Sequence, residues 1–225
     1  AFEQQGFCVV RGPDQLWGGD IHRFHPPADL FAGIIGGPPC QAFSRLVHLV
    51  RANGYEPAEN LIPEYERIVR EARPCWFLME NVPAAPEPAI EGYGVTSMLL
   101  NNRWVGGVQN RERRFSFGAS NERLINLAAH LDIELFEPVE WAPAVTSGAR
   151  AIPVKIGGNG KPKRSYEGNP RVGPGMGPLR TVADMCVLQG LPADYLDEAP
   201  FSENGKRRMI GNGVPLPMGQ AIAKA

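Results

Sequence analysis

A cysteine at residue 40 is presented by a stretch whose composition suits a nucleophile. Residues 36–44 read Gly-Gly-Pro-Pro-Cys-Gln-Ala-Phe-Ser and follow the short apolar run 29–35, which is typical of a buried strand. Glycine and proline end this strand and place Cys40 at its carboxyl end, where open α/β sheets bind ligands. A lone cysteine is most often an inert buried thiol. Two adjacent prolines stiffen the backbone but add little packing, and this favours a reactive cysteine.

Glu80 is the candidate partner of this cysteine. It follows a second apolar run, 74–79, and residues 59–72 between the two runs carry apolar side chains at helical spacing. Strand, helix and strand in this order predict a right-handed crossover between parallel strands. Because neighbouring strand ends lie about 5 Å apart, Cys40 and Glu80 can face one cavity. A thiol and a carboxyl group together suggest addition to an electron-poor ring, with an acid that neutralises the developing charge.

Five motifs resemble those of the DNA (cytosine-5)-methyltransferase family, in the same order and at similar spacing. They lie at 37–44 (Gly-Pro-Pro-Cys-Gln-Ala-Phe-Ser), 80–82 (Glu-Asn-Val), 109–114 (Gln-Asn-Arg-Glu-Arg-Arg), 180–192 (Arg-Thr through Leu-Gln-Gly-Leu-Pro) and 210–215 (Ile-Gly-Asn-Gly-Val-Pro). Each alone is a weak signal, but five in order are specific. The resemblance implies an α/β fold with a Rossmann-like class I methyltransferase sheet, S-adenosyl-L-methionine as cofactor, and double-stranded DNA as partner, as in restriction-modification.

The resemblance also implies a reaction. The Cys40 thiolate would add to C6 of cytosine, which makes C5 nucleophilic toward the methyl group, and Glu80 would stabilise the addition at N3. Arg113 would hold O2 of the base. The C5 proton then leaves and Cys40 is expelled. Because these atoms are inaccessible in a stacked duplex, the cytosine must be flipped out.

The alternation of Gln109, Arg111 and Arg113 predicts that their side chains share one face of one strand. Such charge clusters are usually solvated strand edges, but donors on one face would suit a cytosine carbonyl or a DNA phosphate. With the resemblance, the expected catalytic residues are Cys40, Glu80, Arg111 and Arg113. The expected cofactor-binding residues are Asp20 (adenine), Asp14 (ribose), Pro39, Leu61 and Asn212. The expected DNA-binding residues are Gln41, Ser44, Asn81, Gln109, Lys161, Lys163 and Arg164.

The segments of the chain divide into three expected regions. Residues 1–117 are the expected catalytic domain, and 118–178, rich in glycine, proline and basic residues, are the expected target-recognition region. A flexible linker is the alternative for that composition. Residues 179–225 are expected to return to the catalytic domain, with helices at 181–188, begun by a Thr181 capping box with Asp184, at 202–210 and from 215. A strand at 7–10 and a short helix at 124–131 are also expected.

The family's first strand and its Phe-x-Gly-x-Gly loop, which contacts the methionine part of the cofactor, do not occur before residue 7. We therefore expect an N-terminal segment to be missing, and weak cofactor binding by the chain as given. Two charge-assisted contacts of about 1.5–3 kcal/mol each would account for the loss.

The composition and the cysteine pattern exclude several classes of protein. The 225 residues are 43% hydrophobic with a formal charge of −1, which fits a globular protein and does not argue against a local DNA-binding patch. The four cysteines, Cys8, Cys40, Cys75 and Cys186, form no CxxC pair, so neither a zinc site nor a disulfide framework is expected. No apolar run is long enough for a membrane span. We expect a cytoplasmic monomer without a metal.

Three alternatives stay open at this point. One is a tRNA cytosine-5 methyltransferase of the same fold, and another is a catalytically impaired DNA-binding fragment, although Cys40, Glu80, Arg111 and Arg113 are all present. The third is a cysteine-dependent hydrolase, for which no histidine stands in a matching motif.

Overall fold

The computed structural model describes residues 1–13, 19–43, 54, 56, 59–133, 142–145 and 180–225. These residues belong to two compact units. The first, here called the sheet unit, comprises 6–100, 112–131 and 224–225, and the second, the helical unit, comprises 1–5, 101–111 and 132–223. In the described part of the chain, no helix has both the length and the apolar character to cross a bilayer.

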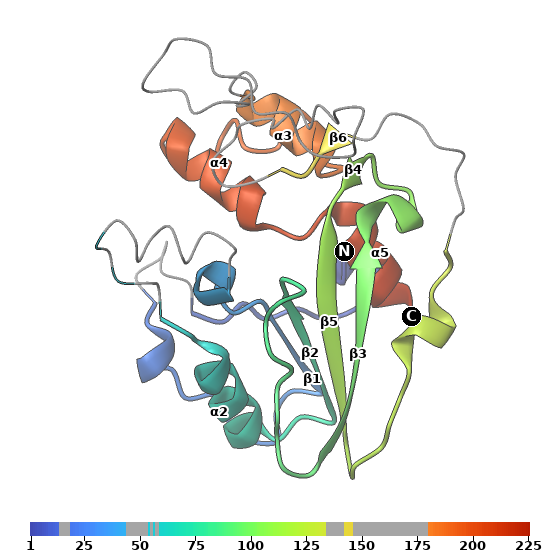
Figure 1. Cartoon of the computed structure of the whole chain (residues 1–225). Helices are drawn as coiled ribbons and strands as arrows, with labels where there is room; N and C mark the ends of the chain where they lie inside the picture. The colour runs from blue at the N-terminus through green and yellow to red at the C-terminus, as the bar shows by residue number, and fades with distance from the viewer. Residues whose placement is uncertain (14–18, 44–53, 55, 57–58, 134–141, 146–179) are drawn as a thin grey trace. The chain divides into compact units, whose positions relative to one another are not determined.

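A four-stranded sheet organises the sheet unit (Figure 1). Its strands lie in the order β1 (Gly33–Gly36), β2 (Trp76–Asn81), β5 (Glu112–Ser120) and β3 (Tyr93–Asn101). Strands β1 and β2 are parallel, with Gly36 opposite Met79, and they are connected through helix α2 (Ile62–Ala72), as the sequence predicted. Strand β5 is antiparallel to β2, so the sheet is mixed.

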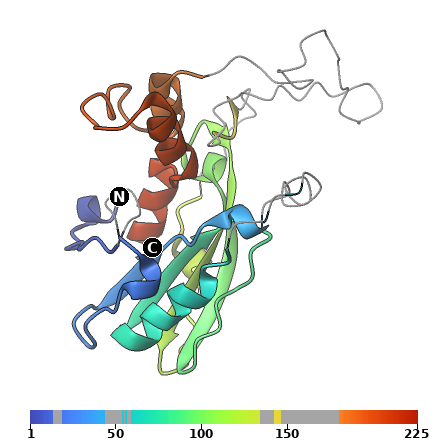
Figure 2. The ribbon, with the colours of Figure 1, turned by 90° about the vertical axis from the view of Figure 1, so that its left-hand side faces the viewer.

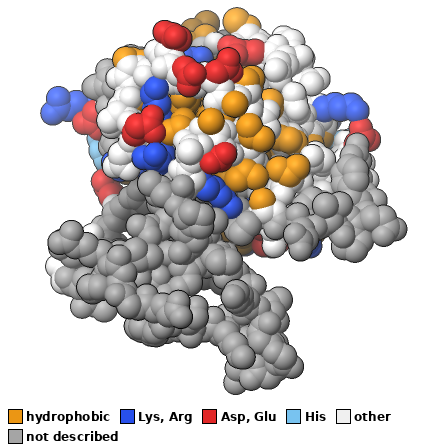
Figure 3. Space-filling model, turned by 90° about the horizontal axis from the view of Figure 1, so that it is seen from above, with side chains coloured by type: hydrophobic (Ala, Val, Ile, Leu, Met, Phe, Trp, Pro, Cys, Tyr) orange, Lys and Arg blue, Asp and Glu red, His pale blue; other side chains and the backbone are white. Residues whose placement is uncertain are grey.

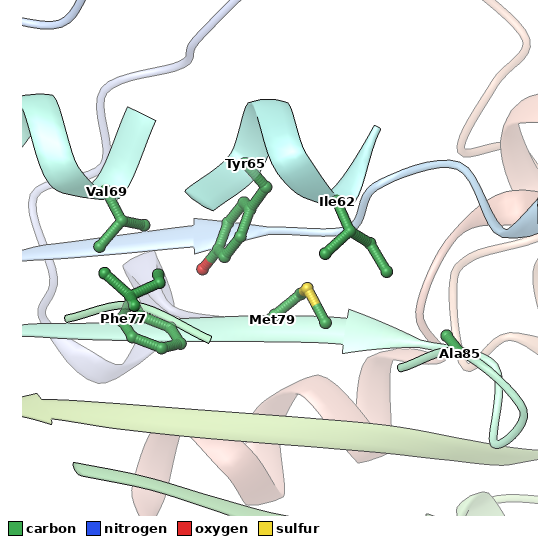
Figure 4. Close-up of a cluster of buried hydrophobic side chains, with 7 residues drawn as sticks. Ile62, Tyr65, Val69, Phe77, Met79 and Ala85 are labelled. Atoms are coloured by element: carbon green, nitrogen blue, oxygen red, sulfur yellow. The ribbon is translucent and has the colours of Figure 1, made fainter. Parts of the chain in front are cut away.

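Helix α2 covers one face of the sheet and forms the core with it (Figures 1 and 2). Ile62, Tyr65 and Val69 point from the helix toward Phe77 and Met79 on β2 (Figure 4). The rings of Tyr65 and Phe77 meet edge to face, with centroids 6.1 Å apart. A side chain larger than hydrogen at Gly118 would not fit, because its Cβ would lie 2.1 Å from the Phe77 ring. The helix therefore sits on a closely packed layer, which fixes the strand ends that carry the site.

The opposite face of the sheet carries a different aromatic group. Trp76 stacks on Phe117 at 6.0 Å and meets Phe7 edge to face at 6.1 Å. Phe7 makes this contact, but residues 7–10 do not form a strand, so the strand expected there is wrong. Val9 and Val10 are exposed, and β-propensity alone did not provide a neighbouring strand to pair with.

The helical unit contains α3 (Val182–Leu188), α4 (Glu203–Asn212) and α5 (Leu216–Lys224). All three confirm helices predicted from the sequence, and Thr181 and Asp184 form the predicted capping box. Two short strands, β4 (Gln109–Asn110) and β6 (Ala142–Pro143), pair in parallel. In the sheet unit, the helix expected at 124–131 is only a 3-10 turn, Leu127–His130. Asn126 is the N-cap of this turn and its side chain accepts from the Ala128 amide, so residues 124–126 lie before the turn.

Candidate active site

The loop after β1 lies against the end of β2 that carries Glu80. A Cβ on Gly37 would lie 3.3 Å from Glu80 Oε2, and the Asn81 side-chain amide donates a hydrogen bond of 3.1 Å to the Pro38 carbonyl. Asn81 is buried, so this bond is shielded from water. Cys40 follows directly, as the first residue of the 3-10 helix Cys40–Phe43, and its free thiol is partly exposed. The two loops thus share one edge of the sheet, because parallel strands end on the same side.

Glu80 forms an ion pair with Arg113. Arg113 Nε lies 2.9 Å from Glu80 Oε1, and the two side chains are 17% and 15% exposed. Strand pairing explains the contact, since Glu80 of β2 is opposite Phe115 of β5, and Arg113 lies two residues from Phe115 on the same face of the sheet. Arg113 Nη1 also donates to the carbonyl of Glu112 at 2.7 Å. A charge-assisted pair at this degree of burial holds both side chains in a defined orientation beside the cysteine loop.

Two of the expected cofactor-binding residues lie close to helix α2 in the sheet unit. Asp20 caps the 3-10 helix Ile21–Arg23, and its carboxylate accepts from the His22 amide at 3.0 Å while remaining exposed. Leu61 immediately precedes α2. The Asp20 carboxylate, which also lies 3.5 Å from Arg23 Nε, is a hydrogen-bond acceptor, as the expected contact with an adenine amino group requires. Pro39 is exposed in the cysteine loop.

Arg67, which the sequence did not single out, attaches the Asp20 segment to α2. Its guanidinium donates to the carbonyls of Ile21 at 2.8 Å and Phe24 at 3.1 Å. On the helix it pairs with Glu64 and Glu71, each at 2.8 Å. The hydrogen bond to Glu71 raises the pKa of Arg67, and the same bond lowers the pKa of Glu71. Arg67 lies three residues after Glu64 and four before Glu71, and this spacing was the available signal, but it indicates only a helix surface.

We expect Arg67→Met to loosen the Asp20 segment. The two carbonyl bonds would be lost, and amide exchange of residues 21–24 should become faster by roughly tenfold or more. Hydrogen–deuterium exchange with mass spectrometry measures this directly. Arg70→Met is the matched control, because Arg70 is exposed on the same helix and should change nothing. Equal exchange rates in the two variants would contradict the anchoring role.

Gln109, Arg111 and Arg113 do not share one face of a strand, so that expectation is wrong. Strand β4 ends at Asn110, and β5 begins at Glu112. Gln109 donates to the Leu188 carbonyl at 2.8 Å, and Arg111 donates to the Gly213 carbonyl at 3.0 Å, both within the helical unit. Only Arg113 pairs with Glu80. The break at Arg111 interrupts the two-residue periodicity on which the expectation rested.

Several expected residues lie outside the described part of the chain. These are Asp14, Ser44, Lys161, Lys163, Arg164 and the side chain of Gln41. Charged side chains of both signs are interspersed with hydrophobic ones on the described part of the face in Figure 3. The described surface on that face therefore shows no single-sign patch for a polyanion, and the expected basic cluster at 161–164 is not among these residues.

Comparison with known structures defines the class of fold. The chain resembles the Entamoeba histolytica methyltransferase EhMeth, with a TM-score of 0.50 and 11% identity over 86% of this chain and 75% of that one. It resembles the S. pombe Dnmt2 methyltransferase to the same degree, with a TM-score of 0.50 and 14% identity over 86% and 77%. The fold is thus the Rossmann-like α/β fold of methyltransferases, as the motifs predicted.

Sequence comparison then defines the family. The family model for C-5 cytosine-specific DNA methylase matches residues 16–171. The chain belongs to the C-5 cytosine-specific DNA methylase family, whose enzymes are DNA (cytosine-5-)-methyltransferases that use S-adenosyl-L-methionine. Type II methyltransferase M.HgiDI of Herpetosiphon aurantiacus is 28% identical over 84% of this chain and 71% of its own length. M.HindV of Haemophilus influenzae is 27% identical over 85% and 73%, and M.FnuDI of Fusobacterium nucleatum is 39% identical over 38% and 28%.

Proposed function

We propose that this protein transfers a methyl group from S-adenosyl-L-methionine to C5 of a cytosine flipped out of duplex DNA, through a covalent bond between Cys40 and C6. The observation that carries the proposal is the Glu80–Arg113 ion pair, with the cysteine loop packed against the same strand end. A carboxyl group and a guanidinium held 2.9 Å apart match the two polar atoms, N3 and O2, on one edge of cytosine.

The chain's own groups would divide the work as follows. The Cys40 thiolate attacks C6, and the ring electrons move toward N3 and O2, where Glu80 shares a proton with N3 and Arg113 donates to O2. Arg113 has five N–H groups, of which two make the contacts to Glu80 and Glu112 described above, so donors remain for the base. After methylation the C5 proton leaves, and the electrons of that C–H bond expel the cysteine sulfur.

The cofactor, when bound, supplies an electrophilic methyl group on a sulfonium centre. Asp20 would accept from its adenine amino group, Leu61 would pack on the ring, and Pro39 would border the site. Asn212 is retained as a further cofactor contact. Residues 118–178 are retained as the target-recognition region, with Lys161, Lys163 and Arg164 as phosphate contacts and Gln41, Ser44 and Asn81 near the base.

Purified protein carrying residues 1–225 tests the proposal when it is incubated with labelled S-adenosyl-L-methionine and either duplex DNA or tRNA. We expect label in DNA, recovered as 5-methylcytosine after digestion. Label in tRNA alone would support the tRNA methyltransferase alternative. Methylation at N4 of cytosine or at adenine would reject the Cys40 adduct, because neither reaction needs a nucleophile at C6.

A further inference from the structure

Three buried polar side chains form a continuous hydrogen-bonded group in the helical unit. Gln109 is fully buried, and Arg111 and Gln189 are each 2% exposed. Gln109 Nε2 donates to Gln189 Oε1 at 2.7 Å and to the Leu188 carbonyl at 2.8 Å. Both N–H bonds of the Gln109 amide are therefore used inside the unit, and none is left for a DNA phosphate.

Val145 completes one side of this group. Its amide donates to Gln109 Oε1 at 2.9 Å, and its carbonyl accepts from Arg111 Nη1 at 2.5 Å. Residues 109–111, residue 145 and the end of α3 are thus joined through side chains, although they are distant in the sequence. Buried groups of this kind are stable only when their members are satisfied together, which makes the arrangement rigid.

The other side of the group holds the segment around Asn212. Gln189 Nε2 donates to the carbonyls of Ile210 at 2.5 Å and Gly213 at 3.1 Å. Arg111 Nη2 donates to the carbonyls of Gly211 at 3.2 Å and Gly213 at 3.0 Å. The carbonyls on both sides of Asn212 are therefore fixed by buried donors, while Asn212 itself is exposed at the end of α4.

We propose that Gln109, Arg111 and Gln189 are positioning residues for Asn212. The inference rests on the proposed function, in which Asn212 contacts the cofactor. Asn212 is the last residue of α4, and the glycines on both sides of it leave this helix end with conformational freedom unless its last carbonyls find donors. Four hydrogen bonds from two side chains remove this freedom before the cofactor binds, which lowers the entropic cost of binding. Gln109 and Arg111 thus act on the cofactor side of the reaction, in contrast to Arg113.

Gln189→Met and Arg111→Lys test this assignment. Methionine keeps the length of glutamine without its amide, and lysine keeps the charge of arginine but cannot bond two carbonyls in a fixed plane. We expect both variants to weaken binding of S-adenosylhomocysteine about tenfold and to raise the KM for the cofactor similarly, while Gln189→Met leaves kcat at saturating cofactor and the Kd for DNA within about twofold. Gln220→Met is the matched control, since Gln220 makes an exposed bond to Gln4 in the same unit.

Combination with Asn212→Ala separates positioning from general stability. If the two side chains act through Asn212, Gln189→Met should add less than about twofold to the loss of cofactor affinity already caused by Asn212→Ala. Multiplied losses, or a change in DNA affinity with intact cofactor affinity, would overturn the inference.

Amide exchange of residues 210–214 supplies a readout that does not depend on the reaction. It should be faster in the Gln189 and Arg111 variants than in the control, and unchanged exchange would overturn the inference even if the wild-type protein methylates DNA. If one of the two variants does not fold, cofactor binding and amide exchange of the other variant test the inference. If the wild-type protein is inactive but the two variants show faster exchange at residues 210–214, the proposed function is rejected. The inference that the two side chains hold the segment around Asn212 would still stand.

Discussion

Replacement of Cys40 by serine should abolish methyl transfer, by a factor on the order of 10⁴ or more, and leave DNA affinity within about twofold. A serine hydroxyl is far less nucleophilic than a thiolate. Affinity should persist because phosphate and recognition contacts supply most of the binding free energy. A serine is close to the size of cysteine, so the loop, whose Gly37 and Pro38 lie against Glu80 and Asn81, should keep its conformation.

A DNA duplex containing 5-fluorocytosine tests directly whether Cys40 forms the covalent bond to the base. Fluorine at C5 cannot leave as a proton, so wild-type protein with cofactor should remain covalently attached to the DNA, and peptide mapping should find the bond at Cys40. Cys75→Ser is the matched control. Cys75 is also exposed, but it immediately precedes β2 and therefore lies at the other end of that strand from Glu80. An adduct with Cys40→Ser, or one mapped to Cys75 or Cys186, would refute the assignment.

The part of the site that the sequence predicted rests on local patterns. Two apolar runs and one amphipathic helix sufficed to place Cys40 and Glu80 at one sheet edge, because a parallel crossover leaves little choice of geometry. Thr181 was recognised as a helix cap for the same reason: its partner, Asp184, is three residues away. These predictions needed no knowledge of how distant segments meet.

The parts that were wrong or missed depend on contacts between distant segments. Periodicity cannot show that the strand breaks at Arg111, and this break separates the contacts of Gln109 and Arg111 from those of Arg113. Arg67 was missed because its decisive partners are backbone carbonyls more than 40 residues away, which carry no sequence signature. The strand expected at 7–10 failed because propensity does not supply a pairing partner.

The second large effect is expected at the Glu80–Arg113 pair. Glu80→Gln removes the group that shares the proton with N3 and should lower kcat by about 10²- to 10⁴-fold. Arg113→Met removes a donor to O2 and should lower kcat by about 10²- to 10³-fold. Each single change also leaves the other charge partly buried without its partner at 2.9 Å, which should cost about 1–3 kcal/mol in the free energy of unfolding.

Coupling between the two residues is the more specific expectation. In the double variant Glu80→Gln with Arg113→Met, no uncompensated charge remains, so the stability loss should be smaller than the sum of the single losses. The loss of kcat should likewise be less than the product, because either single change already disturbs the orientation of the other side chain. Denaturant unfolding and single-turnover methylation of duplex DNA measure the two quantities separately.

Arg114→Met supplies the control for this cycle. Arg114 is the next residue on β5 and pairs with Glu87, whose side chain is 54% exposed, at 3.4 Å. An ion pair with one member so exposed contributes little, so we expect stability to change by less than about 1 kcal/mol and kcat by less than about twofold. Wild-type kcat in Arg113→Met, or strictly multiplicative effects in the double variant, would show that the pair beside Cys40 does not act on the cytosine as a unit.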